Sequence, residues 1–207
     1  MAILAGLAVA DPPALWAELG FGVTGSSCRV ATVDIALGAS GSGVVSWALA
    51  AVDAGGALAD GNVDGLPTAS ADDASPGCPP GRHDNAVTAV DHVVVTTPDL
   101  ERTVGALGRL GVTERRRRDA GRPGGPPMTQ VFFRLGEVIL ELVGPPEPAG
   151  DGPARFFGLA FQVSDLDATA GVLGSRLRPV KAAVQPGRFI ATLDRAAGST
   201  VDMAFMT

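Results

Sequence analysis

The stretch that decides the fold is HVVVTTPD, residues 92–99, followed by LERTVGAL, residues 100–107. The apolar run after His92 predicts a buried strand. Asp99 predicts the start of a helix, because a carboxylate at that position accepts hydrogen bonds from the free N–H groups of the first turn. Leu100, Val104 and Leu107 follow at helical spacing and form one apolar face. The stretch therefore predicts a strand, a turn and a helix.

The same pattern occurs twice more in the chain. LAGLAVAD (residues 4–11) and GLAFQVSD (residues 158–165) are also short apolar runs that end at an aspartate and precede a helical pattern. We expect Asp11 and Asp165 to cap their helices as Asp99 does. Further strand-like runs follow each helix, so each repeat is predicted to be a β-α-β-β-β unit.

The repeats predict an α+β fold with tandem β-α-β-β-β units. Residues 1–54 are expected to form a degenerate N-terminal unit. Residues 55–85, rich in Ala, Gly, Asp, Ser and Pro, are expected to be a linker. Residues 86–207 are expected to form one domain of two paired units, 86–146 and 154–207.

Composition excludes several classes of protein. The chain has 207 residues, of which 46% are hydrophobic, and a net charge of −6, which argues against a nucleic-acid partner. Two cysteines are too few for a disulfide framework. The first apolar run ends at Asp11, so we expect neither a signal peptide nor a membrane span, and a cytoplasmic location.

The repeat resembles the vicinal oxygen chelate superfamily, which includes glyoxalase I, extradiol dioxygenases, methylmalonyl-CoA epimerase and the bleomycin resistance proteins. The similarity lies in DHVVVTTPDL (91–100), RLGEVILELVGP (134–145) and GLAFQVSDLDA (158–168). It implies that two units pair their curved sheets into a cup. In metal-dependent members, the first and last strands of each unit supply the ligands of a divalent ion inside the cup.

Carried over residue by residue, the resemblance implies an incomplete metal site. The first-strand and last-strand positions of the middle unit are His92 and Glu141. In the last unit they are Gly158, which has no side chain to offer, and Asp202. The predicted ligands are therefore His92, Glu141 and Asp202, for one divalent metal (Mn, Fe, Ni, Mg or Zn), or no metal at all.

Strand parity provides a separate prediction about the pocket. Because side chains alternate across a strand, Thr96 shares a face with His92, and Gln162 shares one with Gly158. We expect Thr96 and Gln162 to contact a substrate. Phe161 and Phe205 fall on the opposite, apolar face.

Glu141 is the predicted catalytic residue. It interrupts the apolar run VILELV, and burying an unpaired carboxylate is costly, so it needs a partner, a metal or a raised pKa. The alternative is an edge strand with Glu141 in solvent.

The sequence and the resemblance leave three functions open, of which the third involves neither catalysis nor ligand binding. The first is an enzyme of the glyoxalase type, a lyase, isomerase or dioxygenase, that acts on a small oxygenated molecule with or without a metal. The second is a metal-free protein that binds and sequesters a small molecule, as bleomycin resistance proteins do. The third is a scaffold with a vestigial cup.

The number of units also bears on assembly. Three units leave one without a partner, which predicts a homodimer; alternatively, the first unit folds back on its own chain.

Overall fold

The computed structural model describes residues 1–52, 58, 60–71, 81–121 and 124–207. These residues form an α+β fold of two mixed sheets with few helices. The helices are α1 (Pro13–Glu18), α2 (Leu100–Gly108) and α3 (Leu166–Leu173), and the 3-10 turns are η1 (Gly174–Arg176) and η2 (Arg195–Ala197). The strands are β1 (Ile3–Val9), β2 (Val23–Thr24), β3 (Ser27–Val30), β4 (Val33–Leu37), β5 (Val44–Ala50), β6 (Asn62–Val63), β7 (Leu66–Ser70), β8 (Val87–Thr96), β9 (Glu114–Asp119), β10 (Thr129–Leu135), β11 (Val138–Gly144), β12 (Arg155–Val163), β13 (Lys181–Ala182), β14 (Phe189–Thr192) and β15 (Asp202–Met206).

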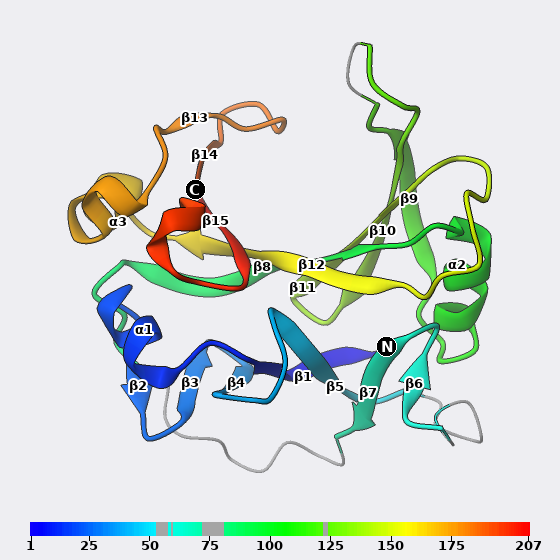
Figure 1. Cartoon of the computed structure of the whole chain (residues 1–207), viewed down its shortest axis with the longest axis horizontal. Coiled ribbons are helices and arrows are strands. Elements are labelled where there is room, and N and C mark those ends of the chain that lie inside the picture. The colour runs from blue at the N-terminus through cyan, green and yellow to red at the C-terminus, as the bar shows by residue number, and fades with distance from the viewer. Residues whose placement is uncertain (53–57, 59, 72–80, 122–123) are drawn as a thin grey trace. The chain divides into compact units, whose positions relative to one another are not determined.

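The strand order follows the predicted repeat (Figure 1). The eight-stranded sheet has the order β13-β14-β15-β12-β8-β11-β10-β9, and the seven-stranded sheet has the order β2-β3-β4-β1-β5-β7-β6. In each complete repeat the first strand runs parallel to the last: β8 beside β11, β12 beside β15 and β1 beside β4. The predicted β-α-β-β-β units are therefore confirmed.

The N-terminal half differs from the expected boundaries. Because β1 pairs with β4, the first repeat is complete at Leu37, and β5 instead pairs in parallel with β7. The range 55–85, expected to be a linker, thus contains β6 and β7. These strands meet at a two-residue turn, Asp64 and Gly65, both with positive φ. An Asp-Gly pair is the usual sequence of such a hairpin turn, so the sequence did contain this signal.

The helix starts agree with prediction at two of the three aspartates. Asp99 accepts a hydrogen bond from the N–H of Arg102, and Asp165 caps α3 in the same way. The prediction for Asp11 is wrong, because Pro12 is the N-cap residue of α1 and no side chain caps this helix. A proline in the first turn needs no cap for its missing N–H, and Asp11 is buried in other contacts.

The chain divides into two compact units. Unit 1 comprises Met1–Ala5, Ser46–Ala74 and His92–Phe157. In its core, the ring of Trp47 lies 5.4 Å from the ring of Phe156, centroid to centroid, and its Nε1 donates to Thr68 Oγ1 at 2.6 Å. The β6–β7 turn is held to α2 by an ion pair of 2.6 Å between Asp64 and Arg102.

Unit 2 comprises Gly6–Val45, Ser75–Asp91 and Gly158–Thr207. Its core joins the N-terminal and C-terminal parts of the chain. Phe161 and Phe205 stack with centroids 5.9 Å apart, and the ring of Phe21 lies 5.1 Å from that of Phe161. Trp16 meets Phe161 edge-on at 6.1 Å. The N-terminal repeat is therefore an integral part of this unit.

The reason for expecting a homodimer does not hold in this fold. The apolar side chains of the N-terminal strands, such as Val30, Ile35 and Leu49, are fully buried within the single chain. The homodimer itself stays a prediction. Among the described helices, none has the length and apolar character needed to cross a membrane.

Candidate functional site

Strands β8 and β11 bring two of the predicted site residues, both in unit 1, onto one face of the sheet. His92 is paired with Ile139 and Val94 with Glu141, so His92 and Glu141 lie diagonally across neighbouring parallel strands. The same parity places Thr96, paired with Val143, on this face. The alternate residues of β11 are buried on the other side, and α2 packs against β11.

Strand β10 extends this surface, which we call the Glu141 face. Its alternate residues Gln130 and Phe132 pair with Val143 and Glu141. The members of the face are half-buried, except for His92, which is buried. The face comprises His92, Val94, Thr96, Gln130, Phe132, Ile139, Glu141 and Val143.

Glu141 is held from one side by an amide. Gln130 donates a hydrogen bond from Nε2 to Oε1 of Glu141. The other end of the amide, Oε1 of Gln130, accepts from Nε of Arg118 at 2.6 Å. Because arginine has only donors, this contact fixes the amide with its NH₂ toward the carboxylate. The result is a relay from Arg118 through Gln130 to Glu141.

Burial and the neighbouring groups have opposite effects on the pKa of Glu141. Burial raises the pKa of the Glu141 carboxyl above its usual range, while the nearby charges of His92 and Arg118 and the hydrogen bond from Gln130 act in the opposite direction. Burial is the largest of these effects. Because β11 lies between β8 and β10 and Glu141 is half-buried, the alternative of an edge strand with Glu141 in solvent is wrong.

Sequence reasoning found Glu141 but missed Gln130. In the run VILELV, Glu141 is conspicuous because its neighbours in the sequence are all apolar. Gln130 is an ordinary polar residue at a strand end, and its role depends on the register between β10 and β11. Its alternation with Phe132 is the only signal in the sequence.

The remaining predicted residues belong to unit 2. Gly158 pairs with Asp202, and Gln162 pairs with Met206. The side chain of Gln162 is exposed and that of Asp202 is 46% exposed, with Arg195 at 4.0 Å. As predicted, Phe161 alternates with Gln162 and is buried.

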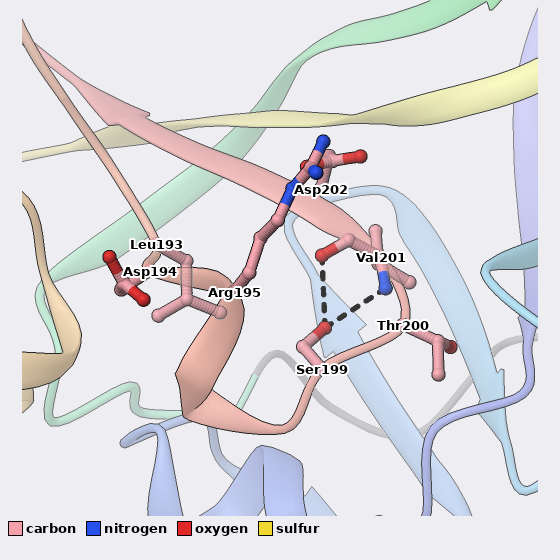
Figure 2. A pocket seen from close by; sticks show the side chains of 7 residues that line it. All are labelled: Leu193, Asp194, Arg195, Ser199, Thr200, Val201 and Asp202. Atoms are coloured by element: carbon pink, nitrogen blue, oxygen red, sulfur yellow. Dashed lines mark hydrogen bonds and ion pairs between the residues drawn. The ribbon is translucent and has the colours of Figure 1, made fainter.

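A cavity of about 250 Å³ lies beside Asp202, between η2 and β15 (Figure 2). Its polar groups are already engaged in holding the loop: Ser199 bonds to Val201 and Thr200 bonds to Asp11. Nothing in its lining requires a ligand, so we place the candidate site on the Glu141 face. The cavity is lined by Leu193, Asp194, Arg195, Ser199, Thr200, Val201 and Asp202.

The donor set does not fit the metal site that the resemblance implies. Within the part of the chain that the structure describes, no group of three or more His, Cys, Asp or Glu side chains is arranged to hold a metal ion. A Cβ on Gly158 would overlap the carbonyl oxygen of Asp202, so the backbone leaves no room for a ligand side chain there. Glu141 is engaged by Gln130 instead.

Comparisons with known proteins agree with this fold. The sequence profile described as the Glyoxalase/Bleomycin resistance protein/Dioxygenase superfamily matches residues 89–192, half of the chain. No curated protein matches the sequence.

Solved structures extend the similarity to the N-terminal half. A variant of 4-hydroxymandelate synthase from Streptomyces coelicolor is similar over 99% of this chain and 91% of its own, with a TM-score of 0.68 and 13% identity. A fusion of a xylose isomerase-like TIM barrel with a 4-hydroxyphenylpyruvate dioxygenase is similar over 99% of this chain and 48% of its own, with a TM-score of 0.64 and 14% identity. Methylmalonyl-CoA epimerase from Mycobacterium tuberculosis covers 58% of this chain and 88% of its own, with a TM-score of 0.46 and 18% identity.

These structural similarities concern the fold alone, since all of the identities are low. The family assignment rests on the sequence profile, and the tandem β-α-β-β-β units agree with it. This chain belongs to the Glyoxalase/Bleomycin resistance protein/Dioxygenase superfamily.

Proposed function

We propose that the chain binds a small oxygenated molecule on the Glu141 face, with Glu141 in contact with a polar atom of the ligand. One observation carries the proposal. Gln130 bonds to Oε1 of Glu141 and so holds this half-buried carboxylate in place on the face. A half-buried carboxylate that is held in this way suits an O–H or N–H donor of a ligand.

The residue at one predicted ligand position favours binding without a metal. Gly158 occupies a position where the resemblance implies a ligand side chain, and its close approach to Asp202 excludes one. We therefore derive no step through a metal ion. Thr96 lies on the same face and supplies a hydroxyl group toward the ligand in this proposal. Two residues of unit 2 remain predictions from the sequence alone: Gln162 as a substrate contact, and Asp202 as a ligand in the alternative with a metal.

A second candidate is an isomerase or lyase in which Glu141 moves a proton. The raised pKa of the Glu141 carboxyl and its contact with Gln130 support it, because a general base must be held in place and have a pKa near the working pH. Gln130 would hold the carboxylate in place during the transfer. Both candidates share the binding step, so binding is tested first.

The test uses the purified, untagged full-length chain. Metal content is measured by mass spectrometry, and ligand binding is measured by thermal shift and calorimetry with lactate, lactamide, hydroxyacetone and catechol. We expect at least one compound to bind, and Glu141→Gln to weaken it about tenfold or more, because the charged acceptor is lost.

The matched control is Glu137→Gln. Glu137 lies in the β10–β11 turn, is exposed, and contributes only its backbone carbonyl to Arg134. It should leave affinity unchanged. Equal affinity of the Glu141→Gln variant and the wild type would remove Glu141 from the site. Stoichiometric metal that is lost in Glu141→Gln would contradict metal-free binding.

A further inference from the structure

The four consecutive arginines of β9, Arg115 to Arg118, differ in what they contact. Arg117 points to the side of the sheet that carries α2, where it pairs with Glu114 at 2.9 Å and also contacts Glu101. Its charge is therefore neutralised. Arg118, one residue further on, faces the opposite way and is paired in the sheet with Gln130. It therefore lies at the edge of the Glu141 face.

Arg118 is the most restrained of the four. It is half-buried, whereas the other three are exposed. Its Nε donates to Gln130 at 2.6 Å, and its guanidinium carbon lies 5.1 Å from the ring centroid of Phe132. The aromatic face and the amide together fix the plane of the guanidinium. Most of the side-chain entropy that a ligand contact would otherwise remove is already lost.

The terminal nitrogens of Arg118 have no partner among the described residues. Only its Nε takes part in a hydrogen bond, and no described carboxylate forms an ion pair with it. A guanidinium with Nη1 and Nη2 unoccupied presents two parallel donors, which match the two oxygens of a carboxylate or phosphate. Arg116, paired with Phe132 on the same side of β9, is exposed and adds positive charge there.

Charge also sets the orientation of such a ligand. The relay places Glu141 at one end and Arg118 at the other, with Gln130 between them. A carboxylate repels an anion and accepts a hydrogen bond from a hydroxyl group, whereas a guanidinium attracts the anion. The face therefore selects a molecule with an anionic group toward the sheet edge and a neutral polar group toward β11.

We propose that Arg118 binds the oxyanion of the ligand, so that the natural ligands of this chain are small organic acids or phosphate esters that also carry a hydroxyl or carbonyl oxygen. This inference rests on the proposed binding function of the Glu141 face. It adds the class of ligand and the residue that selects it.

The experiment follows the Nε–H resonances of the arginines in the full-length chain by NMR. Acetate and methyl phosphate are the probes, and acetamide is the neutral control. We expect saturable shifts of the Arg118 resonance with one or both anions and none with acetamide. Shifts with acetate alone would identify the ligands as carboxylates, and shifts with methyl phosphate alone would identify them as phosphate esters.

Variants separate a site from diffuse charge attraction. Arg118→Gln should weaken anion binding about tenfold or more, because two charge-assisted hydrogen bonds are lost. Arg115→Gln removes the same charge from the same strand and should change affinity less than about twofold. Arg118→Lys keeps the positive charge but lacks the two parallel donors of the guanidinium, so this variant should bind the anion several-fold more weakly than wild type. Equal losses in the Arg115→Gln and Arg118→Gln variants would overturn the proposal.

The outcome is distinguishable from failure of the proposed function. If lactamide or catechol binds in a Glu141-dependent manner while Arg118 does not respond to anions, the ligand class is wrong and the binding function stands. If Arg118 binds acetate but no compound depends on Glu141, the binding function on the Glu141 face is wrong.

Discussion

Asp11 accepts two hydrogen bonds from Thr200 through one carboxylate oxygen: Oδ1 lies 2.7 Å from the backbone nitrogen and 2.6 Å from Oγ1. The other oxygen, Oδ2, accepts from Ser199 Oγ at 2.6 Å and from Trp16 Nε1 at 3.3 Å. Asp11 is only 1% exposed. Residues from opposite ends of the sequence are thus joined around one buried carboxylate in unit 2.

This cluster predicts that Asp11→Asn destabilises the protein strongly. The amide places an NH₂ where donors already converge, and leaves at least one buried donor without an acceptor. We expect the free energy of unfolding to fall by about 2–4 kcal/mol, measured by urea denaturation. The control is Glu18→Gln, an exposed carboxylate on α1, which should stay within about 0.5 kcal/mol of wild type. Matching curves for Asp11→Asn and Glu18→Gln would refute the role of the cluster.

Asp11 also shows why the sequence predicts some features and not others. The fold was predictable because its signals are local: an apolar run, an aspartate and a helical face recur three times. The sequence pattern around Asp11 is the same as that around Asp99, yet its partner is 189 residues away. Gln130 was missed for the same reason, since its role depends on strand register, whereas Glu141 contrasts with its immediate neighbours.

His83 predicts a dependence of stability on pH. Its Nδ1 accepts from the backbone N–H of Gly22 at 3.0 Å, and its Nε2 lies 3.2 Å from the carbonyl oxygen of Arg29. These contacts suit the neutral ring with its proton on Nε2. Protonation would place a second donor against the N–H of Gly22.

Burial lowers the pKa of His83 below its usual value of 6.5, and the hydrogen bond to Arg29 opposes this only in part. Because the unfolded chain takes up the proton first, stability is full above pH 6.5 and decreases as the pH falls through 6.5 toward the folded-state pKa. The difference in unfolding free energy between wild type and the His83→Gln variant isolates the effect of this one group. We expect the difference to shrink by up to about 1.4 kcal/mol per pH unit. A difference that is constant between pH 7.5 and pH 5 would contradict it.

The packing of unit 2 predicts the behaviour of a shortened chain. A chain that begins at His83 lacks Trp16 and Phe21, and exposes the aromatic pair of Phe161 and Phe205. We expect it to aggregate or to lose cooperative unfolding. Cooperative unfolding at the wild-type midpoint would show that the N-terminal repeat is dispensable.

Light scattering of the full chain separately tests the homodimer, which requires a mass of two chains.

Gly158 provides a test of whether this chain could hold a metal in the manner that the resemblance implies. It pairs with Asp202, and a Cβ would overlap the carbonyl oxygen of that residue. Backbone cannot move aside as a flexible side chain can, so Gly158→Ala should lower the free energy of unfolding by about 1–3 kcal/mol. Gly171→Ala is the matched control, since Gly171 lies in α3 with open space around its Cβ position, and should be neutral or slightly stabilising.

Gly158→His supplies the missing ligand type, and it separates a site that has lost one donor from a site whose backbone excludes one. The same overlap with Asp202 applies to any side chain, so we expect this variant to be destabilised at least as much as Gly158→Ala and to take up no metal when it is incubated with Mn²⁺, Fe²⁺, Ni²⁺ or Zn²⁺ and then desalted. Mass spectrometry of the desalted protein is the readout. Stoichiometric metal in Gly158→His, with stability near that of wild type, would show that the strand accommodates the side chain and that a single substitution separates this chain from a metal-binding state.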